Sequence, residues 1–350
     1  MIRAQLAARV WQRTVQSLVD GRWHPLSEVG AVAGVAPQVV RAVLRQWVRM
    51  GAPIQRDSWR GLRFVQPVTP LRCKSQRVSV EVDERLLVDS TNTLALQALG
   101  DGLAQRKVWV AEYQTQGRGR ALRQWHQGLG CGLSLSLAIP AAWVLPPDAL
   151  SLRVGVALAE ALQGLGVRDV QLKWPNDVLW QGKKLGGILI EARRAGVVIG
   201  VGLNQLRASS LSDFRNRSEN LHRPDGFATD SPKVRQAAEQ TLGGLAQPVA
   251  SLQDVFGCRL PARARVQAAL VRTLLRALAD KSAAWRAEFG RFDVLYGRAI
   301  RVYERDGKIW NGVAEGVGEQ GYLRVRTERG MRLCHAAEVS VRVDVPGDCA

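Results

Sequence analysis

The spacing of apolar residues changes twice along this chain of 350 residues, and this change constrains the fold more than any other feature. Apolar residues first recur at helical spacing, then form stretches typical of both strands and helices, and finally form short strands separated by hairpin turns. One hydrophobic core rarely serves a chain of this length. We therefore predict a multidomain α+β protein with domains at 1–66, 75–290 and 296–345.

The first domain is predicted to be a winged helix-turn-helix. An amphipathic stretch over 6–19 precedes a short helix that begins at Leu26, and Pro37 stands at a favourable first position of a third helix. Strand-like residues at 54–56 and 62–65 flank a polar turn and predict a hairpin, the wing. Such domains place their last helix in the major groove of DNA.

The third predicted helix has an apolar face, which we assign to the core, and a polar face. Residues 1–66 contain ten arginines against three acidic residues, a net charge of +7, which is expected of a surface that contacts phosphates. Ala36 stands where a polar helix cap is usual, and Val39 and Val40 leave few polar groups for reading bases. The predicted DNA-binding residues are Gln38, Arg41, Arg45, Arg49 and Arg60.

The middle domain is predicted to be an α/β domain with a mixed, substantially antiparallel sheet. Strands are expected at 108–112, 133–139, 171–174, 187–192 and 197–201, and helices at 149–165 and 263–289. The polar stretch 207–248 has no clear apolar pattern and predicts a long loop. In the third domain, five short strands between 299 and 343 and the hairpin turns that join them predict a small SH3-like β-barrel.

A loop between two predicted strands concentrates glycine and arginine. Residues 117–123 hold three arginines and two glycines, and Trp125 follows closely. Glycine lets a backbone approach a ligand, and arginine binds carboxylates and phosphates through charge-assisted hydrogen bonds. This Gly-Arg loop, residues 117–125, is therefore suited to bringing two anions together. Considered alone, it could equally be a solvated turn.

A second segment strengthens the functional interpretation. Residues 173–177 read Lys-Trp-Pro-Asn-Asp, and a lysine pair at Lys183 and Lys184 then leads into a strand with two adjacent glycines. A strand, a polar turn and a returning strand would bring Asn176, Asp177 and Lys184 to one edge of the sheet.

Together with Asp89-Ser90-Thr91-Asn92 and Gly200-Val201-Gly202-Leu203-Asn204, these two segments resemble the biotin protein ligases in order and spacing. The resemblance covers nearly the whole chain, because both flanking domains fit the bifunctional, BirA-type members of that family. It implies a class II synthetase-like biotin/lipoate ligase fold for the middle domain. It also implies two activities: ATP-dependent attachment of biotin to a protein, and biotin-responsive repression of biotin biosynthesis genes.

The implied reaction has two steps. Biotin and ATP, with Mg²⁺, give biotinyl-5′-AMP, and a lysine of the biotin carboxyl carrier protein of acetyl-CoA carboxylase then takes the biotin. Arg118 and Lys184 are the implied catalytic residues, because they can hold the biotin carboxylate against the α-phosphate. Asp177 is the implied ligand of Mg²⁺, which prefers oxygen.

The resemblance also assigns the remaining site residues. The implied biotin-binding residues are Ser90, Thr91, Asn92, Gln114, Gly117, Arg118, Gly119, Arg120, Lys184, Gly186 and Gly202. The implied ATP-binding residues are Arg120, Arg123, Trp125, Asn176, Asp177 and Asn204. Ser90-Thr91-Asn92 also has the composition of a helix N-cap.

This chain departs from the family pattern in two places. Ala121 and Leu122 stand where the family loop has a second pair of glycines, which would make the loop stiffer or alter its ordering. No tryptophan lies between Trp180 and Trp285, where relatives carry one that covers adenine, so Trp125 is the candidate for a partial cover.

Composition limits the other classes of function. A net charge of +18 favours an anionic partner without identifying it. The five cysteines and four histidines are scattered, which argues against a zinc site, a disulfide framework or a histidine-based catalytic centre. No apolar run has membrane-spanning length, and arginines interrupt the N-terminal apolar positions, so a cytoplasmic protein without a membrane partner is expected.

The family further implies a homodimer that forms when biotinyl-5′-AMP binds and that recognises palindromic operator DNA. Three alternatives stay open at this point. The protein could be a lipoate or other acyl–protein ligase of the same fold, a ligand-sensing DNA-binding regulator without ligase activity, or a ligase whose DNA-binding domain is vestigial.

Overall fold

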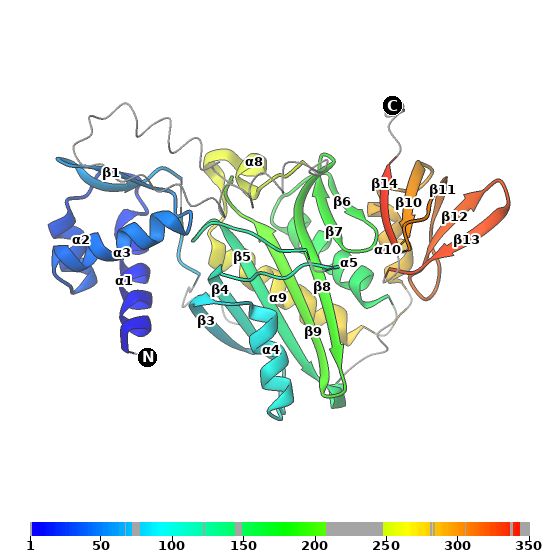
Figure 1. Cartoon of the computed structure of the whole chain (residues 1–350), viewed down its shortest axis with the longest axis horizontal. Helices are drawn as coiled ribbons and strands as arrows, with labels where there is room; N and C mark the ends of the chain where they lie inside the picture. The colour runs from blue at the N-terminus through cyan, green and yellow to red at the C-terminus, as the bar shows by residue number, and fades with distance from the viewer. Residues whose placement is uncertain are drawn as a thin grey trace.

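The computed structural model describes residues 2–66, 68–71, 78–121, 123–143, 149–207, 248–280, 282, 284–304, 306–336 and 339–343. Three structural parts follow one another along the longest axis of the molecule, with the N-terminal part at one end and the C-terminal part at the other (Figure 1). The predictions for Leu122, for most of the 207–248 stretch and for the C-terminal tail lie outside the described residues.

The N-terminal part has the predicted winged helix-turn-helix order. Its elements are α1 (Ile2–Leu18), α2 (Leu26–Ala33), α3 (Pro37–Arg49), β1 (Ile54–Asp57) and β2 (Gly61–Phe64), and the two strands pair antiparallel. Val40, Leu44 and Trp47 of α3 are buried, which confirms that the apolar face belongs to the core. The rings of Trp11 and Trp47 meet edge to face at 5.0 Å, so the third helix is fixed directly against the first.

The central part is built on the predicted mixed sheet. Its strands are β3 (Glu81–Val88), β4 (Lys107–Gln114), β5 (Gly132–Pro140), β6 (Val170–Lys173), β7 (Asp177–Trp180), β8 (Lys183–Arg193) and β9 (Gly196–Asn204). Their order in the sheet is β3-β4-β5-β9-β8-β7-β6, with β3 and β4 parallel and the other neighbours antiparallel. The strands β3 and β7 were not predicted from the sequence.

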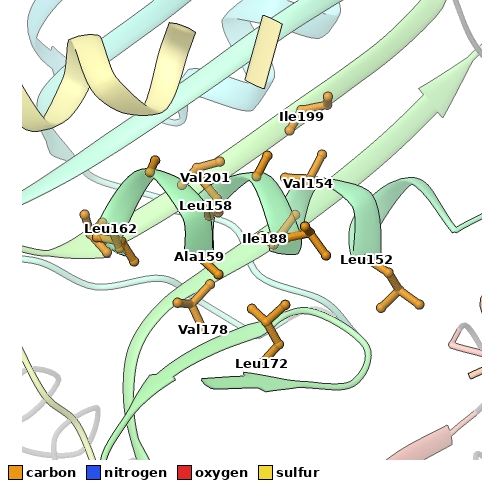
Figure 2. Packing of buried hydrophobic residues seen from close by; sticks show 14 of the residues in the cluster. Leu152, Val154, Leu158, Ala159, Leu162, Leu172, Val178, Ile188, Ile199 and Val201 are labelled. Atoms are coloured by element: carbon orange, nitrogen blue, oxygen red, sulfur yellow. The ribbon is translucent and has the colours of Figure 1, made fainter. Parts of the chain in front are cut away.

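Helices cover the two faces of this sheet unequally. The elements are α4 (Thr91–Gly100), η1 (Ala141–Trp143), α5 (Leu150–Gly164), α8 (Leu252–Phe256), η2 (Gly257–Arg259), α9 (Arg263–Ala279) and α10 (Trp285–Phe292). Alternate side chains of β9 face opposite ways: Ile199 and Val201 join the large core beneath α5, whereas Val198 joins the small cluster under α4. Figure 2 shows α5 seated on the large core.

The single helix predicted over 263–289 is wrong, because the chain breaks between α9 and α10. Asp280 has an extended backbone at the C-terminal end of α9. Its carboxylate accepts hydrogen bonds from the backbone N–H and the hydroxyl of Ser282. Such local bonds compete with helical ones, and a periodic apolar pattern does not reveal them.

The C-terminal part is a five-stranded antiparallel sheet, as predicted. Its strands are β10 (Ala299–Glu304), β11 (Ile309–Val317), β12 (Leu323–Thr327), β13 (Gly330–Cys334) and β14 (Val339–Val343), in the order β13-β12-β11-β10-β14. Ile300 and Val302 belong to the same core as the central part, and the indole N–H of Trp174 donates to the carbonyl of Gly321 at 2.9 Å. The two parts therefore share one packed interior.

The N-terminal part also contacts the central part directly. The backbone N–H of Leu129 donates to the carbonyl of Met50 at 2.8 Å, and Leu129 is buried in the N-terminal core. Arg263, at the start of α9, donates to the backbone oxygen of Thr69 and to both carboxylate oxygens of Glu112. Within the described residues, no helix combines the length and apolar character required to cross a membrane.

Candidate active site

A cavity that opens to solvent lies between the Gly-Arg loop and the sheet. Every predicted biotin- or ATP-binding residue lines this cavity except Gly117, Gly186 and Asn204. Residues separated by more than 100 positions in sequence, from Ser90 to Gly202, are thus brought to one place.

The Gly-Arg loop is closed at its base by backbone hydrogen bonds. The N–H of Trp125 donates to the carbonyl of Gly117 at 2.9 Å, and the N–H of Gly119 donates to the carbonyl of Arg123 at 2.7 Å. A Cβ at Gly117 would lie 2.2 Å from the carbonyl oxygen of Trp125. The two ends of the loop can therefore approach each other this closely only because residue 117 is glycine. Gly117 therefore determines the shape of the loop without lining the cavity itself.

Two glycines of β9 let side chains lie flat on the sheet. A Cβ at Gly202 would lie 2.4 Å from the indole ring of Trp125, and one at Gly200 would lie 2.3 Å from the amide oxygen of Asn92. Both positions therefore exclude any larger residue without a shift of the neighbouring side chain. Trp125 packs on the sheet and also lines the cavity.

The floor of the cavity is a continuous chain of polar side chains. The amide oxygen of Gln114 accepts hydrogen bonds from the backbone N–H and the hydroxyl of Thr91, at 2.8 and 3.1 Å. The hydroxyl of Ser136 lies 2.7 Å from that of Thr91 and 2.5 Å from the amide oxygen of Asn92. In the other direction, the amide N–H of Gln114 donates to Ser134 at 3.0 Å. The buried polar groups are thus paired and held in fixed orientations.

Charged side chains form another part of the cavity wall. Arg118 pairs with Glu191 at 2.7 Å, and Lys184 pairs with Asp177 at 2.8 Å. Arg120 donates to the amide oxygen of Asn176 at 3.1 Å and to the backbone oxygen of Ala336 in the C-terminal part. The loop, the central sheet and the C-terminal part therefore meet at Arg120.

Lys173 does not line the cavity, but it lies close to the charged groups of this wall. Burial lowers the pKa of the Lys173 amine, and the nearby cations Lys184, Arg342 and Arg123 lower it further, against the opposing effect of Asp177. A set of cations that disfavour one another is stabilised by a bound anion. This end of the cavity is therefore electrostatically suited to a polyphosphate.

The three predicted residues outside the cavity lining have structural contacts. The amide of Asn204 donates to the backbone oxygens of Lys184 and Ala250, at 3.3 and 3.0 Å. A Cβ at Gly186 would lie 2.7 Å from the carbonyl oxygen of Gly202, so Gly186 permits close pairing of β8 and β9. Gly117, the third of these residues, allows the close approach of the Trp125 carbonyl at the base of the loop. Ser90, which lines the cavity, also occupies the N-cap position of α4, although its side chain makes no capping hydrogen bond.

Sequence reasoning missed several polar residues near the site. Ser134 and Ser136 alternate within the otherwise apolar strand β5, and this period-two pattern is the signal that could have identified them. Gln127 accepts a hydrogen bond from Ser134 at 3.0 Å. Glu191, near the end of β8, binds both Asn92 and Arg118.

The predicted DNA-binding residues are all exposed. Gln38, Arg41, Arg45 and Arg49 are exposed on the face of α3 opposite its buried residues, and Arg60 is exposed in the β1–β2 turn. The carboxylate of Asp57 accepts hydrogen bonds from the backbone N–H groups of Trp59 and Arg60, both at 2.8 Å, which orders this turn. Trp59 beside it is 94% exposed.

A clustered metal centre is absent from the part of the chain that the structure describes, since no three His, Cys, Asp or Glu side chains gather there. The cavity nevertheless offers oxygen donors from Asp177 and Asn176. One carboxylate and one amide, completed by phosphate oxygens and water, form a donor set that suits Mg²⁺. The residues therefore fit a magnesium ion that arrives with a nucleotide.

Comparison with known protein families agrees with this geometry. Residues 85–204 match the model of the Biotin/lipoate A/B protein ligase family, and residues 296–342 match that of the biotin protein ligase C-terminal domain. The first match contains the cavity floor and the Gly-Arg loop.

Two relatives match this chain over different shares of its length. The chain is 28% identical over 344 residues to the "Bifunctional ligase/repressor BirA" of Salmonella typhimurium, covering 94% of this chain and 96% of that protein. It is 31% identical over 260 residues to the "Biotin--[acetyl-CoA-carboxylase] ligase" of Paracoccus denitrificans, covering 72% of this chain and 96% of that protein.

A solved structure supports the fold. The biotin protein ligase from Aquifex aeolicus, in complex with biotin and ATP, superposes with a TM-score of 0.58 at 22% identity, covering 75% of this chain and 99% of that one. The cavity, the two family matches and the relative of 31% identity lead to one assignment. This chain belongs to the biotin protein ligase family.

Proposed function

We propose that this protein uses the cavity under the Gly-Arg loop to adenylate biotin, and then transfers the biotin to a lysine of a carrier protein. The observation that carries the proposal is that Arg118 and Lys184 face one cavity whose floor is a fixed chain of polar groups. Two cations in one cavity with an oriented set of polar groups suit a ligand with a carboxylate at one end and a polar ring at the other.

In the first step, a carboxylate oxygen of biotin attacks the α-phosphorus of ATP. A new phosphorus–oxygen bond forms, the bond to the β-phosphate oxygen breaks, and pyrophosphate leaves. The two reactants are both anions, so Arg118 and Lys184 accelerate the step by holding them together against their repulsion. The reaction requires no protein nucleophile.

In the second step, the amine of the acceptor lysine attacks the carbonyl carbon of biotinyl-5′-AMP. A carbon–nitrogen bond forms, AMP leaves with the bonding electron pair, and the amine loses its proton to solvent. Arg118 remains beside the departing phosphate and can stabilise its charge.

The polar floor is proposed to bind the ring of biotin. Ser90, Thr91 and Gln114 line the cavity and provide donors and acceptors there. Gly119 allows the loop to approach the apolar part of the ligand, and Gly202 makes room for Trp125 beside it.

The other end of the cavity is proposed to bind the nucleotide. Arg120 and Arg123 would hold its phosphates, and Trp125 would cover part of the adenine. Asp177 and Asn176 would hold Mg²⁺, which would screen the charge of the triphosphate.

Biotin-dependent exchange of labelled pyrophosphate into ATP tests the first step. The protein with biotin and MgATP should exchange label, whereas lipoate in place of biotin should give background. Exchange with lipoate alone would identify a lipoate ligase. If folded protein exchanges no label with either biotin or lipoate, the remaining hypothesis is a ligand-sensing DNA-binding regulator without ligase activity.

We further propose that the protein is a biotin-responsive repressor. The exposed arginines of α3 and the arginine in the β1–β2 turn support DNA binding, and the excess positive charge of residues 1–66 supports phosphate contact. Two copies joined by binding biotinyl-5′-AMP would present two such surfaces to a palindromic operator.

Binding to the DNA upstream of biotin biosynthesis genes tests this role. Affinity should rise with biotin and ATP, fall steeply with salt, and fall further on replacing Arg41 and Arg45 by alanine. Binding that ignores biotin and sequence would indicate a ligase with a vestigial DNA-binding domain.

The natural acceptor is proposed to be the biotin carboxyl carrier protein of acetyl-CoA carboxylase, and the compartment the cytoplasm. Cys131, Cys258 and Cys334 are unpaired thiols, which suits a reducing compartment. Burial raises the pKa of the Cys131 thiol to about 12, so this cysteine is an inert part of the core.

A further inference from the structure

Glu191 is the one acidic side chain that binds both the floor of the cavity and the Gly-Arg loop among the interactions of the described residues. It lies near the end of β8, and its side chain is only 11% exposed. Each carboxylate oxygen has a different partner. Oε2 accepts a hydrogen bond from the amide of Asn92 at 2.8 Å, and Oε1 accepts one from the guanidinium of Arg118 at 2.7 Å.

The contact with Asn92 decides how that amide is oriented. A carboxylate only accepts hydrogen bonds, so the atom of Asn92 that faces Glu191 must be its nitrogen. The amide oxygen then faces the hydroxyl of Ser136, 2.5 Å away, and lies against Gly200. Through Ser136 and Thr91, this orientation extends along the floor to Gln114.

The contact with Arg118 positions a catalytic group that would otherwise have little support. The side chain of Arg118 is 40% exposed and lies on a loop. A long, exposed arginine has many rotamers, and a fixed partner reduces the entropy lost when it binds a ligand. The guanidinium has five N–H donors, so a pair with Glu191 leaves donors for a carboxylate or phosphate.

The floor also reaches the loop at its other end. The hydroxyl of Ser134 donates to the amide oxygen of Gln127 at 3.0 Å, and the indole N–H of Trp125 donates to the same oxygen at 3.4 Å. The polar chain therefore runs from Arg118 through Glu191 and the floor to Trp125. Both ends of the Gly-Arg loop are tied to the groups proposed to bind the biotin ring.

We propose that Glu191 is a positioning residue for adenylate formation: it fixes the biotin-binding floor with one carboxylate oxygen and holds Arg118 over the substrate carboxylate with the other. Binding of the biotin ring and placement of the catalytic arginine are thereby coupled through one side chain. The inference rests on the proposed biotin adenylation.

The variant Glu191→Gln tests this coupling with almost no change in shape. Its amide group has one acceptor, whereas Asn92 and Arg118 both present donors, so one of the two contacts must be lost. Loss of a hydrogen bond to a charged group corresponds to about a tenfold effect or more. In pyrophosphate exchange, kcat/KM for biotin should fall by about tenfold or more, with KM for ATP changed by less than about twofold.

A matched control is Glu315→Gln. Glu315 pairs with Arg326 at 2.5 Å on the C-terminal sheet, away from the cavity lining. This variant should retain the exchange activity of the parent. If the parent itself fails to exchange, the proposed adenylation fails. If the parent is active and Glu191→Gln matches Glu315→Gln, the role of Glu191 alone is overturned.

A double-mutant cycle separates positioning from general structural support. In an Arg118→Gln background, Glu191→Gln should lower the remaining kcat by less than about twofold and should still raise KM for biotin, because the contact with Asn92 is independent of Arg118. Equal, fully additive losses of kcat in both backgrounds would show that Glu191 does not act through Arg118.

Circular dichroism on heating checks that each variant folds. If Glu191→Gln does not fold, Glu191→Asp replaces it, because this variant keeps the charge but is one methylene too short to reach both partners. It should lower kcat/KM for biotin in the same way. Parent-like kinetics of folded Glu191→Asp would contradict the need for one carboxylate to span both contacts.

Discussion

Gly202 carries no side chain, and the site depends on that absence. Its Cα faces the indole ring of Trp125, and a methyl group there would lie 2.4 Å from the ring. Gly202→Ala should therefore displace Trp125 and weaken binding of biotin or ATP by about tenfold or more, measured by calorimetry. Gly164→Ala is the control, since a Cβ at Gly164 would meet no atom within 4 Å. Unchanged binding in Gly202→Ala would contradict the assigned position of Trp125.

Lys184 provides a second prediction at the scale of one residue. It lies in the cavity wall next to Asp177, whereas its neighbour Lys183 is exposed. Lys184→Ala should reduce kcat for pyrophosphate exchange by about 10²–10³-fold, because it removes a cation from the developing charge. Lys183→Ala changes the net charge equally and should leave the rate unaltered. Similar losses in both variants would indicate a general electrostatic effect.

Arg263 shows what a single element contributes to the assembly. Its guanidinium is 1% exposed at the start of α9, and it pairs with Glu112 on β4 at 2.5 and 3.1 Å. Arg263→Ala leaves Glu112 buried without its partner and should cost about 3–5 kcal/mol in the free energy of unfolding. Arg265→Ala, on the exposed side of the same helix, should change it by less than about 0.5 kcal/mol. A comparably small loss for Arg263→Ala would contradict this account.

Asp293, at the end of α10, predicts a dependence on pH. Burial raises the pKa of its carboxyl group from 3.8 to about 6, although backbone N–H groups of Leu295 and Tyr296 oppose the shift. The native state therefore favours the protonated form of Asp293. As pH rises from about 4 to about 6, the unfolded state releases this proton more readily than the native state, so the free energy of unfolding falls.

The side chain in Asp293→Asn cannot ionise, so this variant does not lose stability in this way. The free energy of unfolding of the variant minus that of the parent should rise by roughly 2 kcal/mol between pH 4 and pH 7 and then remain level. Denaturant titrations of both proteins at each pH measure the difference. A difference that does not vary with pH would show that Asp293 is not perturbed.

At the same scale, sequence patterns predicted the elements with strong periodicity and missed those defined by contacts. The apolar stripe of α3 and the helix α5 were predicted because each element has a continuous buried face. The strand β3 has only intermediate and exposed positions at the sheet edge, so it lacks the alternation that reveals a strand. The strand β7 begins at Asp177, within a turn-like sequence.

Most of the candidate site followed from motifs, because loops and turns that bind anions require particular residues. Glu191, Gln127, Ser134 and Ser136 did not follow, since their roles depend on pairings across the sheet that no local pattern contains. The consequence of Leu122 in the loop stays a prediction, because that residue lies outside the described residues.

The whole molecule brings three parts into contact around one site. Arg120 joins the loop to the C-terminal part, Trp174 joins that part to the central domain, and Leu129 joins the central domain to the end of α3. The Gly-Arg loop thus contacts the C-terminal part, and the segment that follows the loop contacts the end of α3. This arrangement permits one ligand to influence both functions.

This cavity is proposed to produce an activated biotin for a carrier lysine. The most direct measurement is mass spectrometry of a folded biotin-acceptor domain after incubation with the protein, biotin and MgATP. One biotin should appear on one lysine, only when ATP is present, and Lys184→Ala should label it far more slowly. An unlabelled acceptor, with folded protein that binds biotin and ATP, would contradict the account.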